Sequence, residues 1–149
     1  MTDLSLVRFE IGDLVNFEPL NENKYLWRDM SANMDNPNRL LFSLIHSETK
    51  KVYALCGMNV LRPGTVEVWS IRGKDFDEYK FNYFKILRRF IHNDILSEVS
   101  EIDRVEIGIR CDEPELFKWA EKLGGEYECT AKKYCKGIDH RVYSIVRED

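Results

Sequence analysis

Three cysteines and a histidine near the C-terminal end of the chain are the residues with the clearest capacity to bind a metal. Cys129, Cys135 and His140 lie close together in the sequence, and Cys111 could be a fourth ligand. Zinc is held in proteins mainly by thiolates and imidazoles. The spacing of these residues matches none of the common zinc patterns, so the sequence predicts no metal site. In a reducing cytoplasm Cys56, Cys111, Cys129 and Cys135 are then free thiols.

Asp139 and His140 form a pair that could move protons. Histidine changes its charge near neutral pH, so His140 could accept a proton or bind a substrate. The alternative is a turn that favours aspartate and leaves the neighbouring histidine exposed. The sequence leaves both interpretations open. His46 and His92 have no such context and are expected on the surface or on a helix face.

The composition predicts one globular domain with its own core. The chain has 149 residues, of which 44% are hydrophobic and 32% are charged, an ordinary balance for a folded protein. Its formal net charge of −4 gives no global reason to expect nucleic-acid binding. No stretch approaches the roughly 20 apolar residues of a membrane span, and the first residues lack the order of a signal peptide.

The first half of the chain predicts a strand, two short helices and three further strands. Apolar residues favour a strand over 4–9, and helical spacing follows over 11–32. Pro19 and the polar residues 21–23 are expected to divide that region into two helices. An antiparallel meander is predicted next, because short polar or Pro-Gly turns separate three strands. These strands are expected at 40–46, 52–61 and 66–71.

The second half predicts alternating helices and strands. Asp75 and Glu78 have the spacing of a capping box, which would start a helix that reaches about Leu96. A strand with alternating apolar and polar residues follows at 103–110, and Pro114 opens another helix, which glycines end. The closing strands are expected at 126–130 and 142–146. This order predicts a mixed α/β domain built on a central sheet.

Residues 120–129 at the end of that helix read AEKLGGEYEC. They resemble the pattern A-x-K-L-G-F-x-x-E-G, which typically precedes the last hairpin in the GNAT superfamily of acetyl-CoA-dependent N-acetyltransferases. Gly125 stands where the family has phenylalanine, and Cys129 stands where it has its last glycine. The order of helices and strands is also similar to that of the family.

Further stretches resemble GNAT-like proteins of tailed bacteriophages. They are ALCG at 54–57, PGTVEVW at 63–69, LRRFI at 87–91 and KYCKGIDHRVY at 133–143. The resemblance implies a single GNAT-like domain over residues 1–149, with a mixed central sheet of about six to seven strands and helices on both faces. It also implies that the strands at 65–71 and 105–110 are parallel neighbours.

The resemblance further implies transfer of an acetyl group from acetyl-CoA to a primary amine of a protein or a small molecule. The alternative is a catalytically silent GNAT-like domain that binds a phage or host protein. Either protein would be a monomer or a homodimer, with neither nucleic acid nor membrane as a partner. A phage origin would place it in the cytoplasm of a bacterial host, or in the virion after packaging.

Three residues carry the expected chemistry if the resemblance extends to activity. Glu67 lies mid-strand, where family members often place a carboxylate that removes the amine proton through water; an exposed glutamate on a sheet face is the alternative. His140 is expected on the substrate side as well. The family's usual acid is a tyrosine near the position of Ala120, and this chain has none there. Tyr134 could act only if the final hairpin folds towards the thioester, and packing is its alternative role.

The family binds the cofactor's pyrophosphate on backbone amides between the fourth strand and the following helix. The matching residues here are Trp69, Ser70, Ile71, Arg72, Gly73 and Lys74. Three carboxylates follow within residues 75–78, and they suit the helix dipole but oppose a phosphate. Arg72 and Lys74 could offset part of that repulsion. An ordinary helix start is the alternative to a phosphate site.

Lys80, Lys85, Arg88 and Arg89 give the same helix a basic side. A solvated face is the ordinary explanation for such a group of charges. Contact with an acidic partner, or with the cofactor's ribose phosphate, is the alternative.

Overall fold

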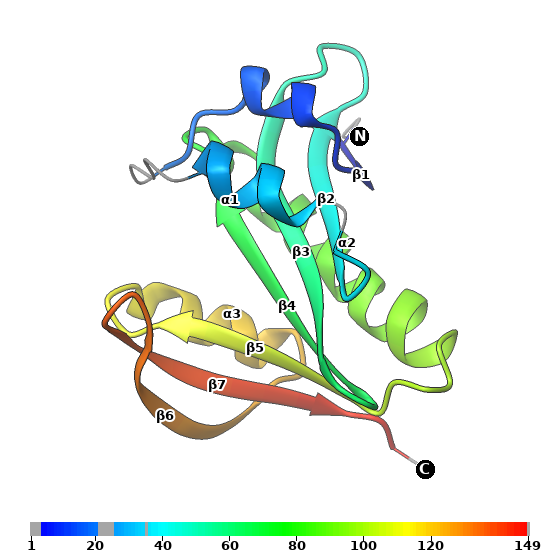
Figure 1. The fold of residues 1–149 in the computed structure, drawn as a ribbon, viewed down its shortest axis with the longest axis vertical. Helices are drawn as coiled ribbons and strands as arrows, with labels where there is room; N and C mark the ends of the chain where they lie inside the picture. Colours follow the sequence, from blue (N-terminus) through cyan, green and yellow to red (C-terminus); the bar gives the residue numbers. More distant parts are fainter. Residues whose placement is uncertain (1–3, 21–25, 35, 149) are drawn as a thin grey trace. The chain divides into compact units, whose positions relative to one another are not determined.

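The computed structural model describes residues 4–20, 26–34 and 36–148. Strands of the described chain form one seven-stranded mixed sheet in the order β1-β2-β3-β4-β5-β7-β6 (Figure 1), which confirms the predicted α/β class. The strands are β1 (Leu4–Arg8), β2 (Arg39–His46), β3 (Val52–Arg62), β4 (Thr65–Arg72), β5 (Arg104–Arg110), β6 (Glu126–Cys135) and β7 (Ile138–Val146). The helical segments are η1 (Ile11–Asn16), α1 (Leu26–Asn33), η2 (Phe76–Glu78), α2 (Lys80–Arg89), η3 (Phe90–Ser97), η4 (Pro114–Leu116) and α3 (Phe117–Lys122).

The described chain is organised in two compact units. The first contains the residues up to Asn59 together with Trp69–Ile86, and the second contains Val60–Val68 and the residues from Leu87 onward. β3 and β4 therefore each contribute residues to both units. The expectation that residues 1–149 form a single domain stays a prediction.

In the first unit, helical segments cover both faces of the antiparallel strands β1, β2 and β3 (Figure 1). η1 and α1 close one face over an apolar cluster. Its buried members are Phe9, Leu14, Phe17, Leu26, Met30, Leu41, Val52 and Leu55. On the other face, the rings of Tyr53 and Tyr79 lie 4.6 Å apart. The buried Cys56 thiol there lies 3.2 Å from the hydroxyl of Tyr83 on α2.

The second unit is built on β4, β5, β7 and β6. β4 and β5 run parallel, with Val66 opposite Val105 and Glu67 opposite Glu106. The predicted parallel pair is therefore confirmed. β7 is antiparallel to both β5 and β6.

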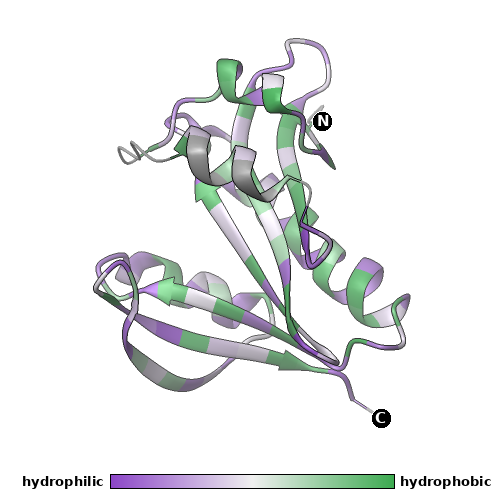
Figure 2. Ribbon diagram, in the orientation of Figure 1, coloured by the Kyte–Doolittle hydropathy of each residue, from purple (hydrophilic) through white to green (hydrophobic). Residues whose placement is uncertain are grey.

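Alternation of residues along these strands produces one apolar and one polar face. Figure 2 shows the alternation as bands of opposite hydropathy along β5 and β7. Val105, Ile107, Tyr143 and Ile145 are buried. The Tyr143 ring lies 6.5 Å from that of Phe117 at the start of α3, so this helix covers the apolar face. Side chains of the opposite parity point to the other face.

The helix expected over residues 75–96 consists of three segments of different geometry, the 3-10 helix η2, the α-helix α2 and the π-helix η3. The predicted capping box at its start is wrong. The Asp75 side chain makes no capping hydrogen bond and instead pairs with Lys51 Nζ at 2.5 Å. An ion pair with the residue just before β3 therefore takes the place of the cap.

The closing hairpin is longer than predicted. β6 extends to Cys135 and β7 begins at Ile138. Asp139 and His140 therefore lie in a strand, and not in the turn that the sequence also allowed. The turn is Lys136-Gly137, whose φ angles of 51° and 77° are the left-handed values that a two-residue hairpin of this kind needs.

Gly73, just after β4, lies at a close approach of backbone segments. Its N–H donates to the Tyr53 carbonyl at 2.7 Å, and the Lys74 N–H donates to the Glu18 carbonyl at 2.8 Å. A Cβ at position 73 would lie 2.4 Å from the Tyr53 oxygen and 3.1 Å from the Phe17 ring. Because the nearer neighbour is backbone, it cannot turn aside, and the contact requires glycine.

We expect Gly73→Ala to lower the free energy of unfolding by about 1–3 kcal/mol, the usual range for a methyl group forced into a packed site. Urea denaturation measures the change. Gly12→Ala is the matched control, because a Cβ there meets nothing within 4 Å. Equal stability of the two variants would contradict the packing role of Gly73.

Candidate functional site

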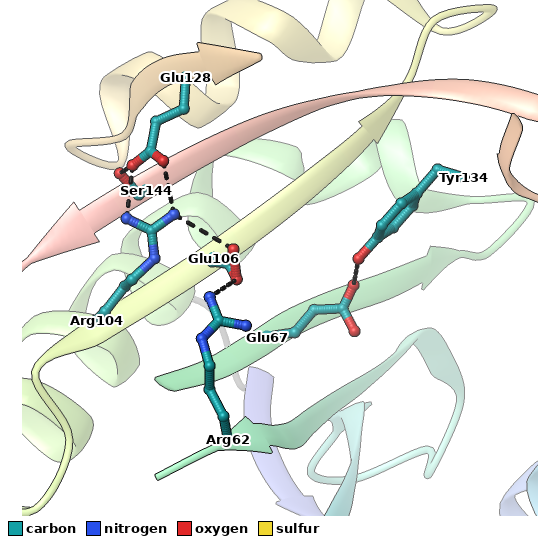
Figure 3. A network of polar contacts seen from close by, with 7 residues as sticks. All are labelled: Arg62, Glu67, Arg104, Glu106, Glu128, Tyr134 and Ser144. Atoms are coloured by element: carbon teal, nitrogen blue, oxygen red, sulfur yellow. Dashed lines mark hydrogen bonds and ion pairs between the residues drawn. The ribbon is translucent and has the colours of Figure 1, made fainter. Parts of the chain in front are cut away.

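The structure brings Glu67, Tyr134 and His140 together in the second unit. The Tyr134 hydroxyl donates to a Glu67 carboxylate oxygen at 3.4 Å (Figure 3). The rings of Tyr134 and His140 lie 5.2 Å apart. Glu67 comes from β4, Tyr134 from β6 and His140 from β7. The three residues that the sequence proposed as catalytic are thus neighbours.

Gly108 on β5 leaves room for this arrangement. A Cβ there would lie 3.7 Å from a ring carbon of His140 and 3.8 Å from a ring carbon of Tyr134. These are ordinary contact distances, so alanine would fit. A longer side chain would occupy the space across which the Tyr134 ring reaches Glu67.

Tyr134 keeps its proton at neutral pH. Partial burial raises the pKa of its hydroxyl, and the nearby Glu67 carboxylate raises the pKa further through its charge and its hydrogen bond. Glu106 acts in the same direction. The hydroxyl is therefore a hydrogen-bond donor at this site.

The His140 ring is oriented by its own strand. Nδ1 lies 3.0 Å from the main-chain oxygen of Ile138. A carbonyl oxygen can only accept a hydrogen bond, so Nδ1 carries the hydrogen. In the neutral ring, Nε2 is then left as an acceptor, and His140 can take a proton or a hydrogen bond there.

A charged network lies beside these residues (Figure 3). Arg104 binds the two oxygens of Glu128 at 2.6 and 2.8 Å and reaches Glu106 at 3.3 Å. Arg62 lies 3.5 Å from Glu106 as well, and the Ser144 hydroxyl donates to Glu128. Sequence reasoning missed this network because it joins separate strands. The alternation that places Arg104 and Glu106 on one face is the signal that could have pointed to it.

The contact between Arg104 and Glu128 keeps both side chains charged. Arg104 lowers the pKa of Glu128 to about 2, and the Ser144 hydroxyl acts in the same direction. The hydrogen bond to Glu128 in turn raises the pKa of Arg104. Positive charge is therefore fixed among the carboxylates of this face.

The residues proposed to bind a cofactor lie in the first unit, at the end of β4 and just after it. They are Trp69, Ser70, Ile71, Arg72, Gly73 and Lys74. The Trp69 ring lies against Gly57, and its Nε1 donates to Asn59 at 3.2 Å. Ile71 packs against the apolar cluster of this unit. Ser70 is exposed, and Arg72 is half-buried.

The amides of Gly73 and Lys74 do not fit a pyrophosphate site, because their N–H groups already donate hydrogen bonds to main-chain carbonyl groups. The Leu20 N–H in turn donates a hydrogen bond to the Arg72 carbonyl at 2.8 Å. Pro19 forms an antiparallel bridge with Gly73. The carbonyls of Tyr53 and Glu18 therefore accept the two N–H groups that a phosphate would need. Gly73 is required for the close approach of the Tyr53 carbonyl.

Within residues 4–20, 26–34 and 36–148, no three His, Cys, Asp or Glu side chains are grouped so as to hold a metal ion. The four cysteines are free thiols, with Cys56 buried and both Cys129 and Cys135 exposed. None of the helices in the described part of the chain is long and apolar enough to cross a membrane.

The fold of this chain is similar to that of several solved structures. No family model and no curated protein matches the chain, but solved structures match nearly all of it. A chimera of spermidine N-acetyltransferase SpeG from Vibrio cholerae and hSSAT has a TM-score of 0.75 at 15% identity, over 97% of this chain and 96% of that chain. Spermidine N-acetyltransferase from Vibrio cholerae in complex with CoA and spermine has a TM-score of 0.72 at 13% identity, also over 97% and 96%.

A further match is SpeG from the same organism in complex with manganese ions. It has a TM-score of 0.69 at 15% identity, over 97% of this chain and 92% of that chain. The chain therefore has the fold of the spermidine N-acetyltransferases, and the GNAT fold expected from the sequence is confirmed. The closer likeness to phage proteins stays a prediction.

Glu128 should contribute stability that is lost in acid. Its pKa of about 2 in the folded protein lies below the ordinary value of 4.5. The contribution is therefore complete above pH 4.5 and is lost as the pH falls towards 2. Glu128→Gln should flatten the decline of the thermal midpoint over this window, modestly because the side chain is 39% exposed.

Thermal melts at a series of pH values measure this decline. Glu126→Gln, two residues earlier on β6, is the matched control and should decline as the wild-type protein does. Equal slopes for wild type and Glu128→Gln would show that the contact with Arg104 does not act in this way.

Proposed function

We propose that this chain is an N-acetyltransferase that transfers the acetyl group of acetyl-CoA to a primary amine of a protein or a small molecule. The observation that carries the proposal is the meeting of Glu67, Tyr134 and His140 on a sheet with the fold of spermidine N-acetyltransferases. One structure with this fold is a complex with CoA and spermine. That likeness supports an amine acceptor and acetyl-CoA as the donor.

Glu67 is the proposed proton acceptor. An amine must lose its proton before the nitrogen can attack a carbonyl carbon. The Glu67 carboxylate takes that proton directly or through water. Tyr134 donates to one of its oxygens and so orients the carboxylate, and His140 adds an acceptor at Nε2. Acetyl-CoA, when bound, supplies the activated acetyl group.

The surroundings of Glu67 suit a positively charged substrate. Glu67 and Glu106 are neighbours across β4 and β5, and carboxylates attract an ammonium group. Glu106 is already bound by Arg62 and Arg104. We assign the contact with the substrate amine to Glu67, because the Tyr134 hydroxyl meets this carboxylate.

Cofactor binding by residues 69–74 is proposed on the resemblance. The amides of Gly73 and Lys74 are donated within the chain, so the pyrophosphate would rest on other groups. The same observation favours a second candidate function, a catalytically silent GNAT-like domain that binds a phage or host protein. Under either proposal, the resemblance to phage proteins supports a location in the cytoplasm of a bacterial host or in the virion.

Calorimetric titration with acetyl-CoA and with desulfo-CoA separates the two candidates. An acetyltransferase should bind both, because the two molecules share the phosphates and the arm that the protein would hold. Glu67→Gln should bind them as the wild-type protein does, since Glu67 is assigned to the amine. If millimolar acetyl-CoA gives no heat of binding, the silent domain is the better description.

Glu67→Gln and His140→Ala should each lower turnover by about 10²–10⁴-fold, the usual effect of removing a positioned proton acceptor. Acetylation of a panel of primary amines that includes spermine measures the rate. The thermal midpoints should change little, because neither residue is fully buried. Normal turnover in both folded variants would exclude these residues from the chemistry.

A further inference from the structure

β6 carries more residues than β7 at two points of the closing hairpin, and the larger excess lies next to the turn. Ala131 pairs with His140, and the next pair is Cys135 with Ile138. Residues 132–134 therefore stand opposite Asp139 alone, and we call these three residues the β6 bulge. In a regular ladder, the residue opposite Ile138 would be Lys133, and Tyr134 would fall in the turn.

Asp139 holds the β6 bulge. Its Oδ1 accepts the Lys133 N–H at 2.8 Å, and its Oδ2 lies 3.5 Å from Lys132 Nζ. Its own main chain is fixed, because its carbonyl accepts the Cys111 N–H at 2.9 Å. The hydrogen bond from the Lys133 amide also keeps the pKa of the Asp139 carboxyl below its ordinary value. The carboxylate is therefore charged at neutral pH.

The bulge holds Lys133 in a conformation that lysine rarely adopts. Its φ of 48° lies in the left-handed region, where a residue with a Cβ is strained. Such an angle persists only where the surroundings hold it, and the hydrogen bond to Asp139 supplies that hold. The next residue is Tyr134, whose side chain extends across β7 and β5 to Glu67 on β4.

We propose that Asp139 is a positioning residue: by holding the Lys133 amide, it fixes the β6 bulge that directs the Tyr134 hydroxyl to Glu67. The consequence for catalysis rests on the function proposed above. The placement of Tyr134 rests on the geometry alone, so the two are tested separately.

The first test measures the pKa of the Tyr134 hydroxyl and does not depend on enzymatic activity. Protein with isotopically labelled tyrosine rings is titrated by NMR, and Tyr134→Phe identifies the signal. In the wild-type protein, the pKa of Tyr134 should lie above its ordinary value of 10.0. Asp139→Ala should lower it towards that value, because a released ring loses its burial and its contact with Glu67. An unchanged Tyr134 titration in folded Asp139→Ala would overturn the proposal.

Two matched variants separate the hydrogen bond from the ion pair. Asp139→Asn keeps an oxygen for the Lys133 amide and should retain the wild-type titration of Tyr134. Lys132→Ala removes only the ion pair and should retain it too. If Lys132→Ala shifts the titration as far as Asp139→Ala does, the charge places Tyr134 and the proposal is overturned.

Two substitutions of Lys133 test the backbone strain. Glycine adopts the left-handed region freely, so Lys133→Gly added to Asp139→Ala should restore part of the wild-type Tyr134 titration. Left-handed φ values are unfavourable for valine because it is β-branched. Lys133→Val should therefore lower the pKa of Tyr134 even with Asp139 in place. Lys133→Val also carries the test if Asp139→Ala does not fold, and an unchanged titration there would overturn the proposal.

Amine acetylation is then measured on the same variants. Asp139→Ala should lower kcat roughly tenfold with little change in KM for the amine, as expected when a group at the site is misplaced and not removed. Asp139→Asn should restore the rate. If Asp139→Ala lowers the pKa of Tyr134 as expected but the wild-type protein acetylates no amine, the proposed function fails and the placement of Tyr134 by Asp139 stands. If the wild-type protein is active and Asp139→Ala moves Tyr134 without lowering kcat, the catalytic consequence is overturned.

Discussion

β4 and β5 run parallel with Glu67 opposite Glu106, so two carboxylates stand at neighbouring positions in the second unit. Like charges at such positions repel each other, and arginines relieve the repulsion. Arg104 binds Glu106 as well as Glu128, and Arg62 also reaches Glu106. Positive charge therefore compensates Glu106. The hydroxyl of Tyr134 donates to Glu67. The candidate site depends on this parallel pair, because it brings a strand from the middle of the sequence within reach of the final hairpin.

Just after β4, the backbone amides of Gly73 and Lys74 are not free to bind a pyrophosphate as the GNAT pattern would require. Gly73 is present where the GNAT pattern has glycines, but its amide is donated to Tyr53 and its missing side chain admits the Tyr53 carbonyl. The adjacent Lys74 amide is donated to Glu18 in the same way. A likeness that covers nearly the whole chain can thus coexist with a local backbone arrangement that serves packing. Fold and function are distinct properties, and the function has to be argued from the site.

Tyr134 reaches the site through an irregular part of a strand. Bulges bend a strand and redirect its side chains, and they are frequent near active sites. In β6, the irregularity includes Lys133 at a positive φ, beside the Asp139 carboxylate. Gly108 adds the space in which the Tyr134 and His140 rings can lie together. The arrangement therefore combines a missing side chain on one strand with additional residues on another.

From the sequence alone, alternation and helical spacing determined the strands and helices, and the family resemblance added the parallel pair with Glu67 in it. The strands and helices follow from short-range patterns that recur every two or about 3.6 residues. The tertiary structure alone decided that Tyr134 meets Glu67, 67 positions away, that Arg104 binds Glu128, 24 positions away, and that Asp75 pairs with Lys51 and caps no helix. Such contacts depend on strand register and on the residues added in β6. Periodicity does not specify either, because an alternating pattern is unchanged when the register shifts by two residues.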